Sequence, residues 1–164
     1  MHIREATPTD ATQIAEIWSH YIRDTIATFN PVEKTTIEIE QMLLDRAQAD
    51  EPFLVATDKD KILGFATYGP FRGGEGYRFV KEHTIQLRTD ATAKGIGRAL
   101  MDRLETHGKA QNIQSLFAGI SGENDLGVKF HRAIGFEHVC TIERVGWKFD
   151  RWHDLILMRK QLQD

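Results

Sequence analysis

The sequence predicts a mixed α+β fold in which helices pack on a central sheet. Along its 164 residues, apolar residues spaced three and four apart, typical of helices, alternate with apolar residues spaced two apart, typical of half-buried strands. The order is strand, two helices, three strands, helix, strand, helix and two strands. No repeat, low-complexity tract or linker interrupts this order. We therefore expect one domain, residues 1–164.

Capping and turn residues bound the N-terminal elements. Residues 7–10 (TPTD) offer capping side chains and a proline suited to a helix start, and residues 35–38 (TTIE) resemble a capping box. Residues 58–61 (DKDK) separate two apolar runs and predict a hairpin turn. We expect a strand at 2–5, a helix with Ile14, Ile17, Trp18, Tyr21 and Ile22 on one face, a loop at 25–31, a helix from 35 to about 49, and strands at 53–57 and 62–68.

The C-terminal elements begin after a glycine-rich segment at 70–76 (PFRGGEG), which predicts an exposed, mobile loop beside a site. Ile85 and Leu87 alternate with polar neighbours, as in a half-buried strand. The expected elements are a strand at 77–88, a loop at 89–94, a helix ending near 111–112, a strand at 116–120, a short helix from Asn124 closed by Gly135, and strands at 136–144 and 147–158.

The segment 82–104 predicts a strand, a short glycine loop (Gly95-Ile96-Gly97) and a helix. This order points several backbone N–H groups at one spot beside a helix N-terminus, where unpaired donors and the helix dipole attract a phosphate or pyrophosphate. A glycine pair alone is a weak signal, because many such pairs only shape a turn before a packed helix. P-loop and dinucleotide-binding motifs are absent from the sequence.

Composition limits the partners and the location. A net charge of −3 and a pI near 6.2 argue against nucleic acid or an anionic membrane as the main partner. The polar N-terminus and the lack of a membrane-length apolar run predict neither a secretory leader nor a span. One cysteine, Cys140, suits a reducing cytoplasm, and seven scattered histidines without metal-ligand spacing predict no metal site.

Four segments of the chain carry distinctive residue patterns, namely 145–155 (VGWKFDRWHDL), 80–87 (VKEHTIQL), 17–21 (IWSHY) and 25–30 (TIATFN). Together they resemble the GCN5-related N-acetyltransferases, in particular the branch that acts on phosphinothricin and methionine sulfoximine. The first two are similar to the G-x-K-F-G-R-W-x-D-L segment and the V-E-H-S-V-Y-V strand of that branch, and the last two to its I-Y-N-x-Y and T-x-x-F elements. The likeness covers nearly the whole chain. It implies a mostly antiparallel seven-stranded sheet flanked by helices, acetyl-CoA as co-substrate, a small amine as acceptor and a homodimer.

The resemblance also implies the residues that bind acetyl-CoA. Backbone amides from Ala93 to Arg98 would meet the pyrophosphate, and Lys94 and Arg98 would add positive charge. An exposed strand edge would pair with the pantetheine, with the Leu87 N–H as candidate donor to the thioester oxygen. Asn124 could bond the pantetheine from the other side or only cap its helix. The cofactor candidates are Ile85, Gln86, Leu87, Ala93, Lys94, Gly95, Ile96, Gly97, Arg98 and Asn124.

Two residues are candidates for the proton transfers. Glu82 would take the ammonium proton, directly or through water, unless it is an ordinary exposed carboxylate. His131 stands where many relatives have a tyrosine that is thought to protonate the departing thiolate, although a histidine beside Phe130 can be structural.

The candidates for contact with the acceptor flank the glycine-rich segment or follow the family motifs. Arg72 and Arg78 could pair with its carboxylate or phosphinate, or remain solvated surface arginines. Phe29 and Trp152 could form the side-chain pocket or belong to the core.

Three functions compete for this sequence. The first is acetyl transfer to the α-amine of phosphinothricin, methionine sulfoximine or methionine sulfone. The second keeps this chemistry but uses another acceptor, namely a protein N-terminus, a lysine or a polyamine. The third is a non-catalytic acetyl-CoA-binding module. The near-neutral charge and the two arginines favour the first, because a polyamine site would need an acidic cluster.

Overall fold

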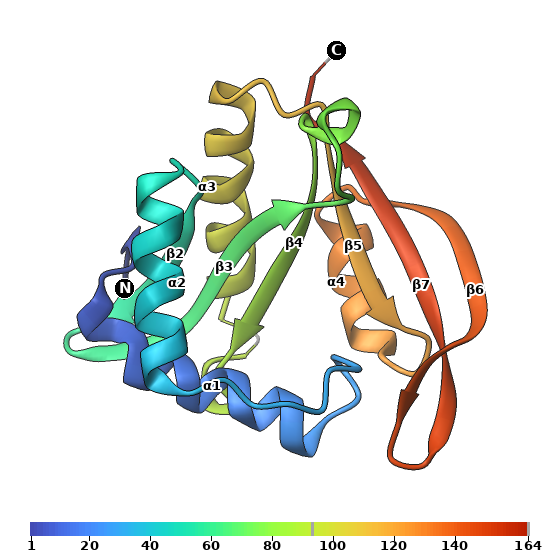
Figure 1. Ribbon diagram of the computed structural model, residues 1–164, viewed down its shortest axis with the longest axis horizontal. Coiled ribbons are helices and arrows are strands. Elements are labelled where there is room, and N and C mark those ends of the chain that lie inside the picture. Colours follow the sequence, from blue (N-terminus) through green and yellow to red (C-terminus); the bar gives the residue numbers. More distant parts are fainter. Residues whose placement is uncertain (93, 164) are drawn as a thin grey trace.

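A computed structural model describes residues 1–92 and 94–163, which contain a seven-stranded sheet in the order β1-β2-β3-β4-β5-β7-β6 (Figure 1). Among these residues, every neighbouring pair of strands is antiparallel except β4 and β5. The expected mostly antiparallel sheet is therefore confirmed. The strands are β1 (His2–Glu5), β2 (Phe53–Asp58), β3 (Lys61–Pro70), β4 (Val80–Leu87), β5 (Ser115–Ser121), β6 (Glu137–Lys148) and β7 (Arg151–Gln161).

Helices cover both faces of the sheet (Figure 1). One core lies under α1 and α2 and includes Ile14, Ile39 and Phe65, while a second core lies under α3 and includes Leu100 and Leu104. The helices are α1 (Ala11–Asp24), α2 (Thr36–Gln48), α3 (Ile96–Ala110) and α4 (Asp125–Ala133), with 3-10 turns η1 (Pro8–Asp10), η2 (Glu75–Tyr77) and η3 (Thr89–Ala91). In the described part of the chain, no helix combines the length and apolar character that a membrane crossing requires.

The expected capping residues fix the start of α2 and both ends of α4, whereas residues 8–10 form the turn η1 and α1 begins without a side-chain cap. Thr35 and Glu38 form a reciprocal capping box, in which the Glu38 N–H donates to Thr35 Oγ1 (3.2 Å) and the Thr35 N–H to Glu38 Oε2 (2.7 Å). Asn124 caps α4 by accepting from the Gly127 N–H (2.9 Å). Gly135 follows α4 with φ = +93°, a left-handed conformation that favours glycine.

Two sequence-based boundaries were wrong. The strand expected at 77–88 begins only at Val80, because residues 75–77 form the turn η2. The break expected between 144 and 147 is a bulge inside a continuous β6, where the register with β7 shifts between Ile142 and Gly146. The hairpin turns instead at Phe149 and Asp150, both with positive φ (51° and 57°), as a two-residue type I′ loop requires.

The β4–β5 pair is short. Pairing is limited to residues 80–82 of β4 and 115–117 of β5, although both strands continue for several residues. Figure 1 shows the two strands separating toward the end of the sheet where α3 begins. In the part of the chain that the structure describes, the second half of β4 therefore has one neighbouring strand, β3.

Candidate active site

The edge of β4 that faces away from β3 carries backbone groups free for a ligand. At one end of the β3–β4 ladder the Phe71 N–H donates to Val80 O (3.2 Å), and at the other the Arg88 N–H donates to Leu63 O (2.8 Å). Hydrogen bonds in an antiparallel ladder alternate along each strand, and the register is continuous. Even-numbered residues of β4 therefore bond to β3, and odd-numbered residues turn their backbone groups toward the gap.

Ile85 and Leu87 thus point their N–H groups into the gap, as a strand that pairs with an extended amide chain requires. The Leu87 carbonyl accepts a hydrogen bond from the Tyr21 hydroxyl (2.7 Å), which ties the end of α1 to this edge. Gln86 is placed differently. Its backbone belongs to the β3 ladder, and its side chain is buried on the α1 face beside Phe65. The expected backbone contact of Gln86 with a cofactor does not fit this orientation.

Past the end of β4, the start of α3 offers free N–H groups. Gly95 adopts φ = +76°, a left-handed conformation that turns the chain into Ile96 and Gly97, the first helical residues. Gly97 also lies close to α4, because a Cβ there would come 3.2 Å from the Phe130 ring. Ala93, the first residue of the expected pyrophosphate loop, lies outside the described residues. A helix N-terminus of this kind attracts an anion through its unpaired donors and dipole.

The two expected cations flank this loop. Lys94 is exposed, and its Nζ donates to Asp90 O (2.9 Å). Arg98 is also exposed, and its Nη2 donates to Ala133 O (2.9 Å) at the end of α4. Both positively charged groups thus lie near the start of α3, and both donate hydrogen bonds to backbone carbonyls.

Glu82 lies at the last paired position of β4, where the strands part. Its half-buried side chain reaches over β5 toward Gly119, since a Cβ at Gly119 would lie 2.7 Å from Glu82 Oε1. Burial raises the pKa of the Glu82 carboxyl. The carboxyl is therefore a stronger base than an exposed glutamate, next to the gap in the sheet.

His131 faces the opposite side of the sheet and contacts a histidine of β4. Its Nε2 lies 3.1 Å from His83 Nε2, its Nδ1 lies 2.7 Å from Gly127 O, and the two rings are stacked. A carbonyl only accepts, so His131 Nδ1 carries the proton, and its Nε2 accepts from His83 Nε2–H. Burial lowers the pKa of both rings, that of His83 to about 3.

This bonding does not suit the proton-donor role expected of His131. In the neutral pair, the one N–H of His131 is bonded to Gly127, which leaves none for a departing thiolate. His83 Nδ1 is buried without a partner among the described residues. The pair instead links α4 to β4.

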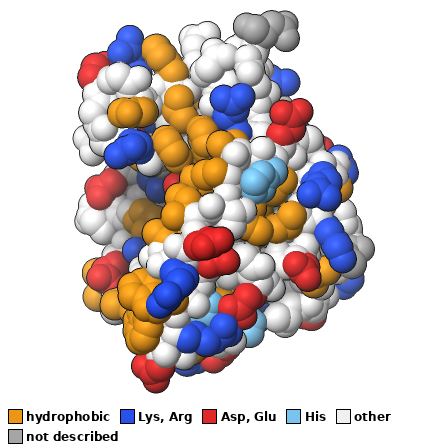
Figure 2. All heavy atoms as spheres, turned by 90° about the vertical axis from the view of Figure 1, so that its right-hand side faces the viewer, with side chains coloured by type: hydrophobic (Ala, Val, Ile, Leu, Met, Phe, Trp, Pro, Cys, Tyr) orange, Lys and Arg blue, Asp and Glu red, His pale blue; other side chains and the backbone are white. Residues whose placement is uncertain are grey.

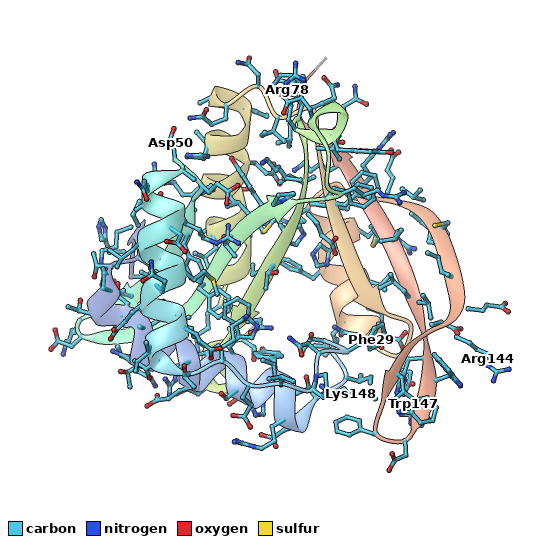
Figure 3. All side chains as sticks on the ribbon, viewed as in Figure 1. Phe29, Asp50, Arg78, Arg144, Trp147 and Lys148 are labelled. Carbon is cyan, nitrogen blue, oxygen red and sulfur yellow. The ribbon has the colours of Figure 1, made fainter. Side chains whose placement is uncertain are left out.

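Two of the four residues expected to contact the acceptor, Arg78 and Phe29, lie far apart. Figure 3 shows Arg78 at one end of the sheet and Phe29 at the other. Arg72 and Arg78 are exposed and lie over Tyr77 and Phe79, respectively.

The two aromatic candidates lie near the β6–β7 turn. Phe29 is half-buried and stacks on His153, with ring centroids 5.7 Å apart. Trp152 is 49% exposed and meets Trp147 edge to face. Neither ring belongs to the two cores.

Sequence reasoning missed several polar residues around this site. His83, Lys148 and His153 are buried, and all three fall in the family-like segments 80–87 and 145–155. The motifs themselves assign no role to these three residues. The sequence feature that could have identified them is a charged or imidazole side chain at an inward-facing position of a strand. Such a side chain needs a hydrogen-bonding partner when it is buried.

The chain resembles known acetyltransferases in sequence and in fold. A family model described as an acetyltransferase (GNAT) domain matches residues 3–157. The L-methionine sulfoximine/L-methionine sulfone acetyltransferase of Pseudomonas aeruginosa is 34% identical over 98% of this chain and 94% of its own length. The L-amino acid N-acyltransferase MnaT of Escherichia coli is 32% identical over 100% of this chain and 95% of its own. A phosphinothricin acetyltransferase from Sinorhizobium meliloti, solved with acetyl-CoA, has a TM-score of 0.92 at 29% identity and covers 98% of this chain and 87% of its own.

Proposed function

This chain belongs to the GNAT family of acetyltransferases, and from that premise we propose that it transfers the acetyl group of acetyl-CoA to the α-amine of a small amino-acid-like molecule. The acceptors we propose are phosphinothricin, methionine sulfoximine and methionine sulfone, which the names of the relatives specify. The observation that carries the proposal is the unpaired edge of β4, residues 83–87, which lies between Glu82 and the loop that leads into α3. We propose one catalytic domain spanning residues 1–164.

The residues present fit acetyl-CoA. The Ile85 and Leu87 backbone groups on the β4 edge suit the amides of a pantetheine arm, which is an extended chain with one donor and one acceptor per amide. Residues 94–98 at the α3 N-terminus suit the pyrophosphate, and Lys94 and Arg98 add charge. Asn124 is already bonded to the Gly127 N–H through its oxygen, so only its amide N–H groups remain to meet the arm. When bound, acetyl-CoA supplies an activated acyl group.

Glu82 is the residue we propose as general base. An α-ammonium titrates near pH 8 and must lose a proton before its nitrogen can attack the thioester carbon. The Glu82 carboxylate accepts this proton, directly or through one water. The new C–N bond then forms as the C–S bond breaks, the thiolate leaves, and the nitrogen loses its remaining extra proton to water, which yields the neutral amide. Because an ordinary thiol has a pKa of about 8.5, it departs without an acid, so His131 is not needed as a donor.

Of the two arginines, we propose that Arg72 binds the acceptor carboxylate. The residue before it, Phe71, stacks on Phe117 (4.2 Å between centroids), and Phe117 is in register with Glu82. Arg78 pairs with Glu75 on the exposed turn η2. Arg72→Gln should raise the KM for the amino acid and Arg78→Gln, the matched control, should leave it unchanged. Equal effects of the two changes would reject this assignment.

The test of the proposed function is CoA release, followed with a thiol reagent, for a panel of amines. The panel contains phosphinothricin, methionine sulfoximine, methionine sulfone, common amino acids, an N-terminal peptide and spermidine. Turnover of the first three with loss in Glu82→Gln is the expected result. Turnover of the peptide or of spermidine alone would show that the acceptor is a protein N-terminus or a polyamine. Acetyl-CoA binding without turnover of any amine would indicate a binding module.

We also propose a homodimer built on the face of β6 and β7. β6 is an edge strand, and Figure 2 shows hydrophobic side chains gathered on that side of the molecule. Val139, Val145 and Trp147 of β6 are each about half exposed (49%, 48% and 52%). Light scattering should give twice the chain mass, and Trp147→Asp should halve it. A monomeric wild type would exclude the dimer.

The cytoplasm is the location that we propose, because a single free thiol, Cys140, suits a reducing compartment. The net charge of −3 supports a small-molecule acceptor over nucleic acid or an anionic membrane. Cell fractionation that recovers the protein outside the cytoplasm would contradict the location.

A further inference from the structure

The family-like segment 145–155 holds a buried lysine that the transfer chemistry above does not use. Lys148 is 5% exposed, and its Nζ donates to Thr25 O (2.6 Å), Thr28 O (2.7 Å) and, more weakly, Tyr21 O (3.4 Å). An ammonium has three N–H groups, so these carbonyls use its full donor capacity. All three belong to the last turn of α1 or to the loop that follows it. In Figure 3, Lys148 lies beside this loop at the turn end of the β6–β7 hairpin.

The carbonyls at the end of α1 need such a partner. The last carbonyls of a helix have no intrahelical N–H, and the helix dipole favours a cation at this end. The helix stops at Asp24 and the chain continues without regular structure to Thr35, so no following turn of helix supplies donors. Within the loop, the bonds are local, such as Thr25 Oγ1–H to Tyr21 O (2.9 Å). Lys148 therefore fixes the path of the loop from outside it.

The same hairpin fixes the aromatic ring that the loop carries. The Phe29 ring stacks on His153 with an angle of 18° between the planes. It also lies directly against Gly146, where a Cβ would overlap the ring. Phe29 is thus held from two sides by residues of β6 and β7.

His153 is itself rigidly held. Its Nδ1 lies 2.6 Å from Glu123 Oε1, and its Nε2 lies 2.9 Å from Lys148 O. Both partners are acceptors, so both ring nitrogens donate. Arg151 binds both oxygens of Glu123 (2.6 and 2.8 Å), and chiefly for this reason the pKa of that carboxyl falls to about 2. The support behind Phe29 is therefore a charged, fully bonded network.

We propose that Lys148 is a positioning residue for the amine acceptor: it holds the 25–30 loop so that Phe29 forms one wall of the acceptor pocket. This inference rests on the proposed function. The end of α1 links the two sites, because Tyr21 accepts from Lys148 through its carbonyl and donates through its hydroxyl to Leu87 on the β4 edge. Lys148 thereby sets the distance between the loop and the strand where the thioester would lie, without touching either reactant.

The test compares Lys148→Met with Lys148→Arg and with Lys109→Met, an exposed lysine on α3, as matched control. A displacement of the pocket wall by about 1 Å can reduce the reaction rate by up to about 100-fold. Lys148→Met should raise the KM for the amine at least tenfold, while the Kd for acetyl-CoA, from calorimetry, changes less than twofold. Lys148→Arg should not restore the KM, because a planar guanidinium cannot direct three N–H groups at one converging set of carbonyls. Lys109→Met should match the wild type.

Two further measurements separate positioning from general damage. Gly146→Ala should also raise the KM for the amine, because it displaces Phe29 while Lys148 stays intact. Amide exchange in the full chain should accelerate at residues 25–30 of Lys148→Met and stay unchanged in β2. Equal rises in the amine KM and the acetyl-CoA Kd, or unchanged exchange at 25–30, would overturn the inference. If the wild type acetylates no amine, the proposed function fails, and the exchange result alone decides whether Lys148 orders the loop.

Discussion

A methyl group added on β5 should displace the Glu82 carboxylate and impair its function, although Glu82 itself is not mutated. In Gly119→Ala the new Cβ would lie 2.7 Å from Glu82 Oε1, and an ordinary contact begins at 3.4 Å, so the carboxylate must move by about 0.7 Å. A catalytic group displaced by about 1 Å can cost about 100-fold in rate. We therefore expect kcat/KM to fall about 10- to 100-fold, which corresponds to about 1.4 to 2.7 kcal/mol of transition-state stabilisation.

The assay is steady-state CoA release with the best amine of the panel, together with urea unfolding. Gly119 is exposed and the displaced atom ends a flexible side chain, so the free energy of unfolding should change by less than about 1 kcal/mol. Gly73→Ala is the control, since a Cβ there meets nothing within 4 Å. Adding Gly119→Ala to Glu82→Gln should cause no further loss. Wild-type kcat/KM in Gly119→Ala, or full additivity in the double mutant, would refute the reasoning.

Four other outcomes follow from the described contacts. Burial raises the pKa of Glu82, and a base acts only when it is ionised, so kcat/KM should fall with decreasing pH while the pH is still above 4.5, the ordinary pKa of a glutamate. Glu82→Gln should be about 10²- to 10⁴-fold slower and should not show this fall in kcat/KM at acid pH. Gly95→Ala should weaken acetyl-CoA binding in calorimetry, because φ = +76° strains a Cβ, whereas Gly95→Asn should weaken it less. Lys160→Met should lower the free energy of unfolding, measured with urea, by about 3 to 5 kcal/mol, because it leaves the buried Glu105 carboxylate without a cation. In the wild type the two oxygens of Glu105 lie 2.6 and 2.8 Å from Lys160 Nζ. Asn124→Ala should cost about 1 kcal/mol through the lost α4 cap, and an unchanged melting curve would contradict this.

The element order followed from the sequence because local signals govern it. The Thr35–Glu38 capping box and the glycines at 95 and 135 each act within a few residues, and the structure has helix ends at all three. The end of β6 was missed because a bulge depends on pairing with β7, which is non-local.

The site was harder to predict than the fold. The family-like segments led to Glu82, which lies where the strands part. Sequence spacing could not reveal that Gln86 turns its backbone to β3, because a strand's hydrogen-bonding parity is set by its neighbour. Sequence spacing also could not show that His131 donates its N–H to the Gly127 carbonyl, or that Lys148 donates to carbonyls 120 to 127 positions earlier in the chain.

The short β4–β5 pairing makes this protein a sheet in two leaves, β1–β4 and β5–β7–β6, joined by three residues on each strand. A ligand that lies between the leaves and bonds to the β4 edge would act as a missing eighth strand. Its binding would then add RT ln(1 + [L]/Kd) to the free energy of unfolding, about 2.7 kcal/mol at a hundredfold excess over Kd, and would raise the melting temperature accordingly. When acetyl-CoA is depleted, we therefore expect the three-residue β4–β5 junction to open more readily than the longer strand pairs on either side of it.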